Sequence, residues 1–404
     1  MELLDSIWIV VGYILIAKTI FHLPVSRWRD GLFALTNLTA VALVYDWGAY
    51  ILFLVGYVAF VLFQYLVCFK WKYTASAHIV GILFPVIVLF LLKYLPDGVY
   101  NYLGFARPNG SGPIFIGIVG LSYMAFRLSY IVTEVRAKVV PVPGIAQYLS
   151  FAFFLPTLAV GPISKFQTFY DSYNKSTNNL PGFEESMTRV AIGLAKFALL
   201  APLFSQFQFD SLLMDRHVHE YWELAVACVG FYLFLYCNFS GFCDMAIGLA
   251  GLIGVRVDEN FNNPFVARNI QDFWNRWHIT LNVYMRDMLF TPMSKALVHR
   301  FGPKHLNVAI VLSLFVVFLL IGVWHGREVQ FLLFGLMHAI GVTVVHIYGL
   351  VLRKSLGAQG YRLYQSNSVV RCVAILLTFC FVASTFLVFA NDMQEIETLW
   401  QTLG

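Results

Sequence analysis

Long apolar runs alternate with short polar connections along the whole chain. Runs of about 18 to 22 residues are long enough to cross the hydrocarbon core of a bilayer as helices. We expect such helices at 6–23, 31–46, 50–68, 77–96, 114–133, 187–206, 223–240, 307–324, 329–351 and 370–390. The pattern predicts an all-α fold, a polytopic transmembrane helix bundle of about 10–12 spans with further re-entrant or interfacial helices.

Two apolar segments, 145–160 and 241–254, are too short to span, and we expect them to be re-entrant or embedded in protein. In the first, Pro156 and the Gly161-Pro162 pair break the helix and predict a re-entrant turn. Lys165 follows this turn, where it could anchor the turn at the cytoplasmic face.

Composition excludes a soluble globule. Of the 404 residues, 59% are apolar and 12% are charged, whereas soluble domains carry about 25% charged residues. Too few charges are present to cover a water-facing surface. The net charge of +5 is small and no long basic run is present, so nucleic acid is not an expected partner. We expect a single membrane-embedded unit over 1–404, with N-terminal spanning helices at 1–110, a core at 114–351 and a C-terminal span at 370–390.

Basic residues are placed unevenly between the first five predicted helices. Because basic loops stay on the cytoplasmic side, the loops near residues 27, 71 and 137 should be inside and the N-terminus outside. The residues that carry this prediction are Arg27, Arg29, Lys70, Lys72, Arg136 and Lys138, against Asp46, Asp97 and a single Arg107 in the opposite loops. Glu2 and Asp5 replace the basic region of a signal peptide, which favours a retained first helix in a multi-pass cell-membrane protein.

The densest polar cluster spans Gln271 to Asp287, between predicted membrane segments. Helical spacing would pair Asp272 with Arg276 and would place His278, Asn282 and Arg286 on one face. Trp274 and Trp277 would bracket the histidine. One interpretation is an interfacial anchoring helix without chemistry. The other is a neutral histidine that acts as a base, since its unperturbed pKa lies close to neutral.

A second candidate is His325, in Gly322-Val323-Trp324-His325-Gly326 at the end of an apolar run. The glycines allow another segment or a substrate to approach closely. Taken alone, His325 is better explained as a satisfied core residue, and we also interpret His338 and His346 as structural. The six cysteines form no CxxC pair and no metal-ligand spacing is evident, so no metal site is expected.

Together these segments resemble the membrane-bound O-acyltransferase superfamily. Within it, the bacterial branch with the teichoic-acid D-alanyl transfer membrane protein and the alginate O-acetyltransferase is the most similar. The resemblance rests on motifs that follow one another in family order: 120–127, 154–163, 238–248, 259–265, 272–278 and 322–326. Features of the D-alanyl and the acetyl types are mixed, and 290–295 lacks the Gly-Gly-Asn-Arg of the alginate type.

The resemblance implies that His325 is the catalytic histidine and His278 the second one, in a tunnel through the helix bundle. We expect substrate-binding roles for Asn282, Arg286, Trp274, Trp324, Asp272 and Arg276. The implied donor is an acyl thioester, from a carrier protein or coenzyme A, that arrives from the cytoplasm, and no cofactor would be tightly bound. Besides membrane lipid, the implied partners are a cytoplasmic acyl carrier protein and an extracytoplasmic acyltransferase.

The sequence therefore predicts an O-acyltransferase that moves a D-alanyl or acetyl group toward hydroxyls of a cell-envelope polymer or of a partner protein. Two alternatives remain open. A transporter without chemistry would suit the broken helix at Pro156–Pro162, and a non-catalytic scaffold would support an extracytoplasmic enzyme.

Overall fold

The computed structural model describes residues 3–44, 51–70, 75–94, 120–174, 180–213 and 218–403, and in these ranges the chain is helical with irregular connections. Across them the extended pairings are two isolated bridges, His219 with Leu403 and Phe261 with Trp277. The residues group into two compact units, Met1–Gly193 with Phe242–Asp258 and Leu194–Gly241 with Glu259–Gly404. Each unit is described by itself. The grouping of 114–351 as one catalytic core stays a prediction.

The predicted apolar runs are helices wherever they fall on the described residues. Stretches long and apolar enough to cross a membrane are Phe183–Leu212, Tyr221–Ile253, Pro303–His325, Val329–Ser366 and Ser368–Ala390. Shorter apolar helices cover Ile7–His22, Leu54–Lys70 and Ser76–Leu91. The all-α polytopic fold is therefore confirmed. Part of the predicted run 114–133, and the loop residues Asp46, Lys72, Asp97 and Arg107, lie outside the described residues, and the side of the membrane that holds the N-terminus stays a prediction.

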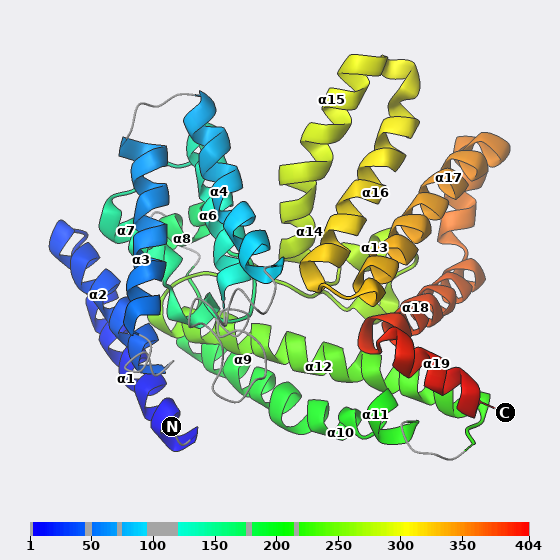
Figure 1. Cartoon of the computed structure of the whole chain (residues 1–404), viewed down its shortest axis with the longest axis horizontal. Helices are drawn as coiled ribbons and strands as arrows, with labels where there is room; N and C mark the ends of the chain where they lie inside the picture. The colour runs from blue at the N-terminus through cyan, green and yellow to red at the C-terminus, as the bar shows by residue number, and fades with distance from the viewer. Residues whose placement is uncertain are drawn as a thin grey trace. The chain divides into compact units, whose positions relative to one another are not determined.

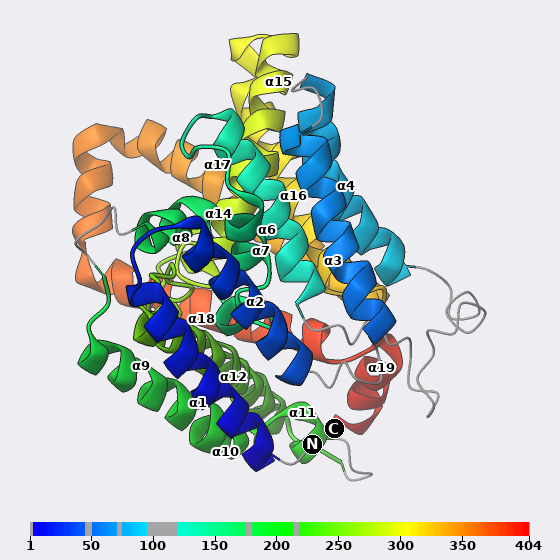
Figure 2. The same ribbon diagram turned by 90° about the vertical axis from the view of Figure 1, so that its left-hand side faces the viewer.

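The first unit is built from antiparallel helices and a broken segment (Figure 2). Its helices are α1 (Leu3–His22), α2 (Arg27–Val44), α3 (Ile51–Tyr65) with the π-helical η1 (Leu66–Lys70), α4 (Ala75–Tyr94), α6 (Leu121–Arg136), α7 (Ile145–Ala152), η2 (Leu155–Thr157), α8 (Phe166–Tyr173) and α9 (Phe183–Ala195). Helix α1 packs on α2, α2 on α7, and α4 on α6.

Two of the family-like motifs interlock inside this unit. Gly120 begins α6 with φ 94°, and a Cβ there would overlap the carbonyl oxygen of Leu158. The buried Arg127 donates to the carbonyls of Thr157 and Phe151 and lies over the Phe151 ring at 4.5 Å. The segment after α7 is held through its own backbone carbonyls, which a broken helix leaves without intrahelical partners.

The predicted break near Pro156 is confirmed. Helix α7 ends at Ala152, the 3-10 turn η2 follows, and regular helix resumes only at Phe166 in α8. Glu134 caps the new helix, because its carboxylate accepts from the backbone N–H groups of Phe166 and Gln167 at 2.9 and 3.3 Å.

The prediction of a separate short segment at 241–254 is wrong. Residues 223–240 and 241–254 form one 33-residue helix, α12 (Tyr221–Ile253). No proline interrupts it, and its internal glycines are tolerated because they face close neighbours: at Gly248 a Cβ would crowd Val190 and the backbone of Ser186. Packing of α9 residues on these glycines stabilises the continuous helix.

The second unit contains the remaining elements (Figure 1). They are η3 (Lys196–Leu200), α10 (Ala201–Ser205), α11 (Phe209–Leu212), the first part of α12, η4 (Pro264–Val266), α13 (Ile270–Trp274), α14 (Ile279–Met285), η5 (Arg286–Phe290), α15 (Thr291–Phe301), η6 (Pro303–His305), α16 (Leu306–His325), α17 (Val329–Ser366), α18 (Ser368–Ala390) and α19 (Met393–Thr402). Helix α16 packs on α17, and α17 on α18.

Glycines bring α16 and α17 into backbone contact. A Cβ on Gly322 would overlap the carbonyl oxygen of Phe331, and one on Gly335 would overlap that of Phe318. The two sites face each other, because the Cα of Gly322 also lies near the position of a Gly335 Cβ. The segment that approaches the Gly322–Gly326 motif closely, as expected from its glycines, is therefore helix α17.

Candidate active site around two histidines

The polar segment from Gln271 to Asp287 does not form the single amphipathic helix that its spacing predicts. Helix α13 ends at Trp274, and α14 begins after His278, whose φ of 46° and ψ of 51° are left-handed. A non-glycine residue in this region is strained, and such residues concentrate at functional sites. The prediction that His278, Asn282 and Arg286 share one helix face is therefore wrong, since the histidine lies at the N-cap.

Asn260 holds the chain in this bent conformation. Its side-chain oxygen accepts from Nδ1 of His278 at 3.1 Å, from the backbone N–H of Thr280 at 3.2 Å and from the Thr280 hydroxyl at 2.8 Å. Its backbone carbonyl accepts from Ile279 at 2.9 Å. Asn262 and Arg276 pair through their backbones beside the bridge between Phe261 and Trp277. The 259–265 and 272–278 motifs are thus one local structure.

These contacts determine the state of the His278 ring. The Thr280 N–H can only donate, so the Asn260 atom that faces it is the carbonyl oxygen, and Nδ1 of His278 must carry the proton that it donates. Burial, and the neighbouring His325 to a smaller extent, lower the pKa of His278 to about 3. The ring is therefore neutral at physiological pH, with its lone pair on Nε2.

Trp324 connects the two predicted histidines. Its ring centre lies 6.2 Å from that of His278 and 4.7 Å from that of His325. The ring of His278 also meets Phe239 of α12, edge to face at 4.8 Å. The expected bracket of Trp274 and Trp277 is replaced by Trp324 and Phe239, because the bend at His278 turns its ring away from its neighbours in sequence.

His325 ends α16, and the chain turns away at Gly326. A Cβ at Gly326 would collide with the ring of Phe331, so any side chain at this position would displace that ring. The imidazole contacts Phe389 of α18 edge to face at 5.1 Å and Phe334 of α17 at 6.2 Å. His325 is half-buried, whereas His278 is only 4% exposed. Of the two rings, His325 is the one that a substrate can reach more readily.

The other predicted site residues have definite places. Arg276 pairs with Asp272 at 2.8 Å, which confirms the predicted i,i+4 pair. Asn282 donates to the side chain of Asn275 at 3.3 Å. Arg286 is exposed and pairs with Asp287 at 3.0 Å. Their proposed roles in substrate binding stay predictions.

Trp274 turns instead toward the buried His338. Its indole N–H donates to Nδ1 of His338 at 3.2 Å, and Nε2 of His338 lies 3.1 Å from the hydroxyl of Thr385. That hydroxyl donates to the Val382 carbonyl, so Nε2 carries the proton and the ring is neutral. His338 is a hydrogen-bonded core histidine that ties α13 and α17 to α18, as the structural interpretation expected.

Sequence reasoning missed three groups around the histidines: Asn260 and Thr280, which position His278, and Phe389, which contacts His325. Asn260 lies within the quoted 259–265 motif, so its position there was a usable signal. Nothing in the sequence distinguishes Phe389 from the other phenylalanines of α18.

A helical membrane protein with a buried, neutral histidine beside a second, more accessible one has the groups for proton transfer within lipid-embedded protein. Comparison with known families assigns it: residues 31–386 match the family described as MBOAT, membrane-bound O-acyltransferase family. The chain belongs to this family and is an O-acyltransferase, as the resemblance predicted.

The relatives of this chain differ in the acyl group and the acceptor that their names give. This chain is 26% identical to the teichoic acid D-alanyltransferase of Bacillus subtilis over 325 residues, and these residues make up 77% of each chain. It is 29% identical over 338 residues to the probable alginate O-acetylase AlgI of Azotobacter vinelandii, covering 80% of this chain and 65% of the relative. It is 32% identical over 213 residues to the peptidoglycan O-acetyltransferase of Helicobacter pylori, covering 51% of this chain and 38% of the relative.

Proposed function

We propose that this enzyme transfers a D-alanyl or acetyl group from a cytoplasmic thioester to hydroxyls of a cell-envelope polymer or of a partner protein. The observation that carries the proposal is the arrangement of His278, Trp324 and His325, with centre-to-centre ring distances of 6.2 and 4.7 Å. The names of the relatives support a polymer as the acceptor, since they name teichoic acid, alginate and peptidoglycan.

In this reaction His325 acts as the general base. It takes the proton of the incoming hydroxyl while that oxygen forms a bond to the thioester carbonyl carbon. The carbon–sulfur bond then breaks, and the imidazolium returns the proton to the departing thiolate. The half-buried position of His325 suits this role because a base must reach both reactants.

His278 has a different role, because its pKa of about 3 makes it a poor proton acceptor near neutral pH. It accepts a hydrogen bond through Nε2 and orients the donor, while Asn260 fixes the ring. Asn282 and Arg286 bind the donor next to it, and Trp274, Asp272 and Arg276 support the segment that presents these groups. Trp324 packs against the acyl group and separates the two imidazoles.

The donor enters from the cytoplasm, carried by an acyl carrier protein or coenzyme A. Arg136, the last residue of α6, and Lys138 are exposed in the first unit, and Lys165 precedes α8. Positive charge at a cytoplasmic loop attracts an acidic carrier protein or the phosphates of coenzyme A. On the other side of the membrane, a partner acyltransferase receives the acyl group where the acceptor is a protein.

The decisive experiment compares His325→Ala with His346→Ala in proteoliposomes loaded with an acceptor. His346, elsewhere on α17, lies 3.3 Å from Asn307 and is a matched histidine control. We expect His325→Ala to lower acyl transfer by about 10²–10⁴-fold, with unchanged expression and melting temperature, and His346→Ala to stay near wild type. Transfer within tenfold of wild type in His325→Ala would remove the proposed base.

A second readout separates catalysis from transport. Flux of a labelled acyl donor into the vesicles without any acylated product would contradict the proposed transfer to an acceptor hydroxyl. Mass spectrometry of envelope polymers from cells with and without the gene identifies the acyl group, since the added mass distinguishes D-alanyl from acetyl.

A further inference from the structure

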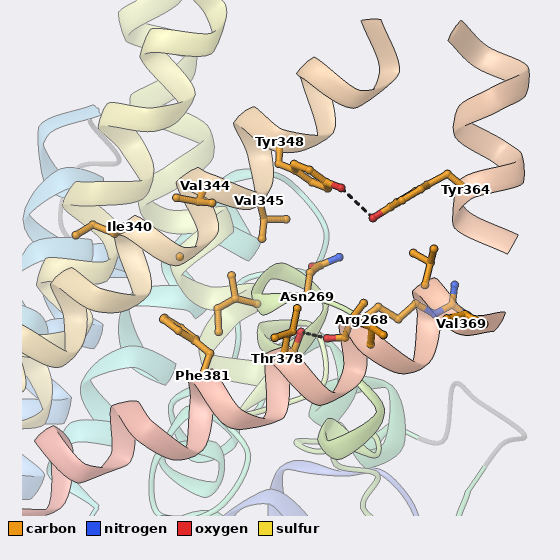
Figure 3. A pocket seen from close by; sticks show the side chains of 16 residues that line it. Arg268, Asn269, Ile340, Val344, Val345, Tyr348, Tyr364, Val369, Thr378 and Phe381 are labelled. Atoms are coloured by element: carbon orange, nitrogen blue, oxygen red, sulfur yellow. Dashed lines mark hydrogen bonds between the residues drawn. The ribbon is translucent and has the colours of Figure 1, made fainter. Parts of the chain in front are cut away.

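A cavity of about 650 Å³ lies in the second unit between α17, α18 and the start of α13 (Figure 3). Its walls are mostly aliphatic, with Ile340 and Phe381 at one end and Tyr348, Tyr364 and Val369 at the other. The volume is in the range of small-molecule binding sites. None of the predicted site residues lines it, so it is separate from the two histidines.

The tyrosine end of this cavity is polar and cationic. The hydroxyls of Tyr348 and Tyr364 hydrogen-bond at 2.9 Å, and α17 reverses direction between them at Gly357, whose φ is 65°. A smaller adjoining cavity of about 190 Å³ shares Arg268 and Asn269 and adds Arg371 and Gln365 to its wall. No acidic side chain is among the described residues that line either cavity.

The helices that form the cavity, α17 and α18, also carry net positive charge. From Val329 to Ala390 the sequence holds no Asp or Glu, and its Lys and Arg residues all lie between 353 and 371, on either side of the reversal at Gly357: Arg353, Lys354, Arg362 and Arg371. Such clusters lie on the cytoplasmic side and attract anionic lipids. This end of the cavity should therefore lie at the level of the inner-leaflet headgroups.

The aliphatic wall faces outward. Val344 is 58% exposed and Leu377 65% exposed, although both lie in helices that are long and apolar enough to span the membrane. An apolar surface that is open at membrane depth contacts lipid chains rather than water. Two arginines, Arg268 and Arg371, line the other end. The cavity is therefore amphipathic, with one hydrocarbon end and one end suited to a phosphate.

We propose that this cavity binds one anionic glycerophospholipid of the surrounding bilayer. The phosphate lies between Arg268 and Arg371 and also accepts from a tyrosine hydroxyl, since arginine recognises phosphate through charge-assisted hydrogen bonds. An acyl chain follows the aliphatic wall toward Ile340 and Phe381. This site goes beyond the acyl-transfer reaction and is independent of it.

The experiment titrates the purified full-length protein in detergent with phosphatidylglycerol or phosphatidylcholine and counts bound lipids by native mass spectrometry. We expect phosphatidylglycerol to be retained preferentially, and Arg268→Gln/Arg371→Gln to lower that preference on the order of tenfold. Arg362→Gln is the control, because it removes a positive charge from the same basic stretch of the chain but Arg362 lines neither cavity. Ala374→Phe, within both walls, should reduce binding of both lipids by filling the space.

The proposal is overturned if the two lipids bind equally to the wild-type protein, or if Arg362→Gln lowers the preference as much as the double variant. The second result would mean diffuse attraction to a basic surface instead of a built site. The experiment measures only lipid binding. Its outcome therefore does not depend on whether His325 is the catalytic base.

Discussion

Nδ1 of His278 donates a hydrogen bond to the side-chain oxygen of Asn260 across 3.1 Å. The two residues are 18 positions apart, and the same oxygen also binds both donors of Thr280. One asparagine therefore determines the conformation of the segment that presents the histidine and also the nitrogen that keeps the lone pair.

Replacing Asn260 should loosen this structure. Asn260→Ala leaves three donors without their acceptor, and we expect a loss of about 1–3 kcal/mol in the free energy of unfolding together with reduced acyl transfer. Thermal unfolding in detergent and a transfer assay measure the two effects. Asn262→Ala is the control, since Asn262 uses its backbone to pair with Arg276. Equal stability of the two variants would contradict the role of Asn260.

The low pKa of His278 predicts an acid-sensitive fold. Its pKa falls from the ordinary 6.5 to about 3 in the folded protein, so the unfolded state binds the proton more readily. The full stability from this group is present above pH 6.5 and is lost as the pH falls toward 3. At pH 4.5 the loss amounts to about 3 kcal/mol.

His278→Gln, which does not titrate, tests this assignment. Its melting temperature should fall less than that of the wild type between pH 7 and pH 4.5, whatever its value at pH 7. Parallel pH profiles of the two proteins would show that the acid sensitivity arises elsewhere.

The glycine contact between α16 and α17 should be intolerant of a methyl group. Gly322→Ala places a Cβ on the carbonyl of Phe331, which must push the helices apart and displace His325, three residues on. We expect destabilisation of about 1–3 kcal/mol and a marked loss of acyl transfer. Gly349→Ala is the matched control, because a Cβ there comes no nearer than 4.0 Å to the Tyr361 hydroxyl. A Gly322→Ala protein as stable and active as Gly349→Ala would exclude the tight contact.

The hydrogen bond from Trp274 to His338 should contribute to stability rather than to the reaction. Trp274→Phe keeps an aromatic ring but leaves the buried Nδ1 without this donor, at a cost of about 1–3 kcal/mol. Thermal unfolding measures the change, with Trp400→Phe at an exposed position as control. A near-normal rate of acyl transfer per folded molecule is expected. A normal melting temperature would show that the bond contributes nothing.

The fold class could be predicted from the sequence because it depends on local composition. A helix in a bilayer satisfies its own backbone hydrogen bonds, so a run of apolar residues such as 307–324 or 370–390 is enough to specify it. The break near Pro156 is equally local, since proline removes a backbone donor. The pairing of Asp272 with Arg276 needed only the i,i+4 spacing. The order of the motifs was sufficient to identify the acyltransferase family.

Other features depended on contacts between distant segments, which spacing along the chain does not encode. The left-handed backbone at His278 results from Asn260, and it separates the histidine from the face that helical periodicity assigned to it. The continuity of α12 depends on α9 residues that pack against its glycines. The sequence alone determined that this is a helical membrane acyltransferase with two histidines of interest. Only the tertiary structure decided that one ring is buried and neutral while the other is more accessible, because burial and hydrogen-bond partners arise when the helices pack.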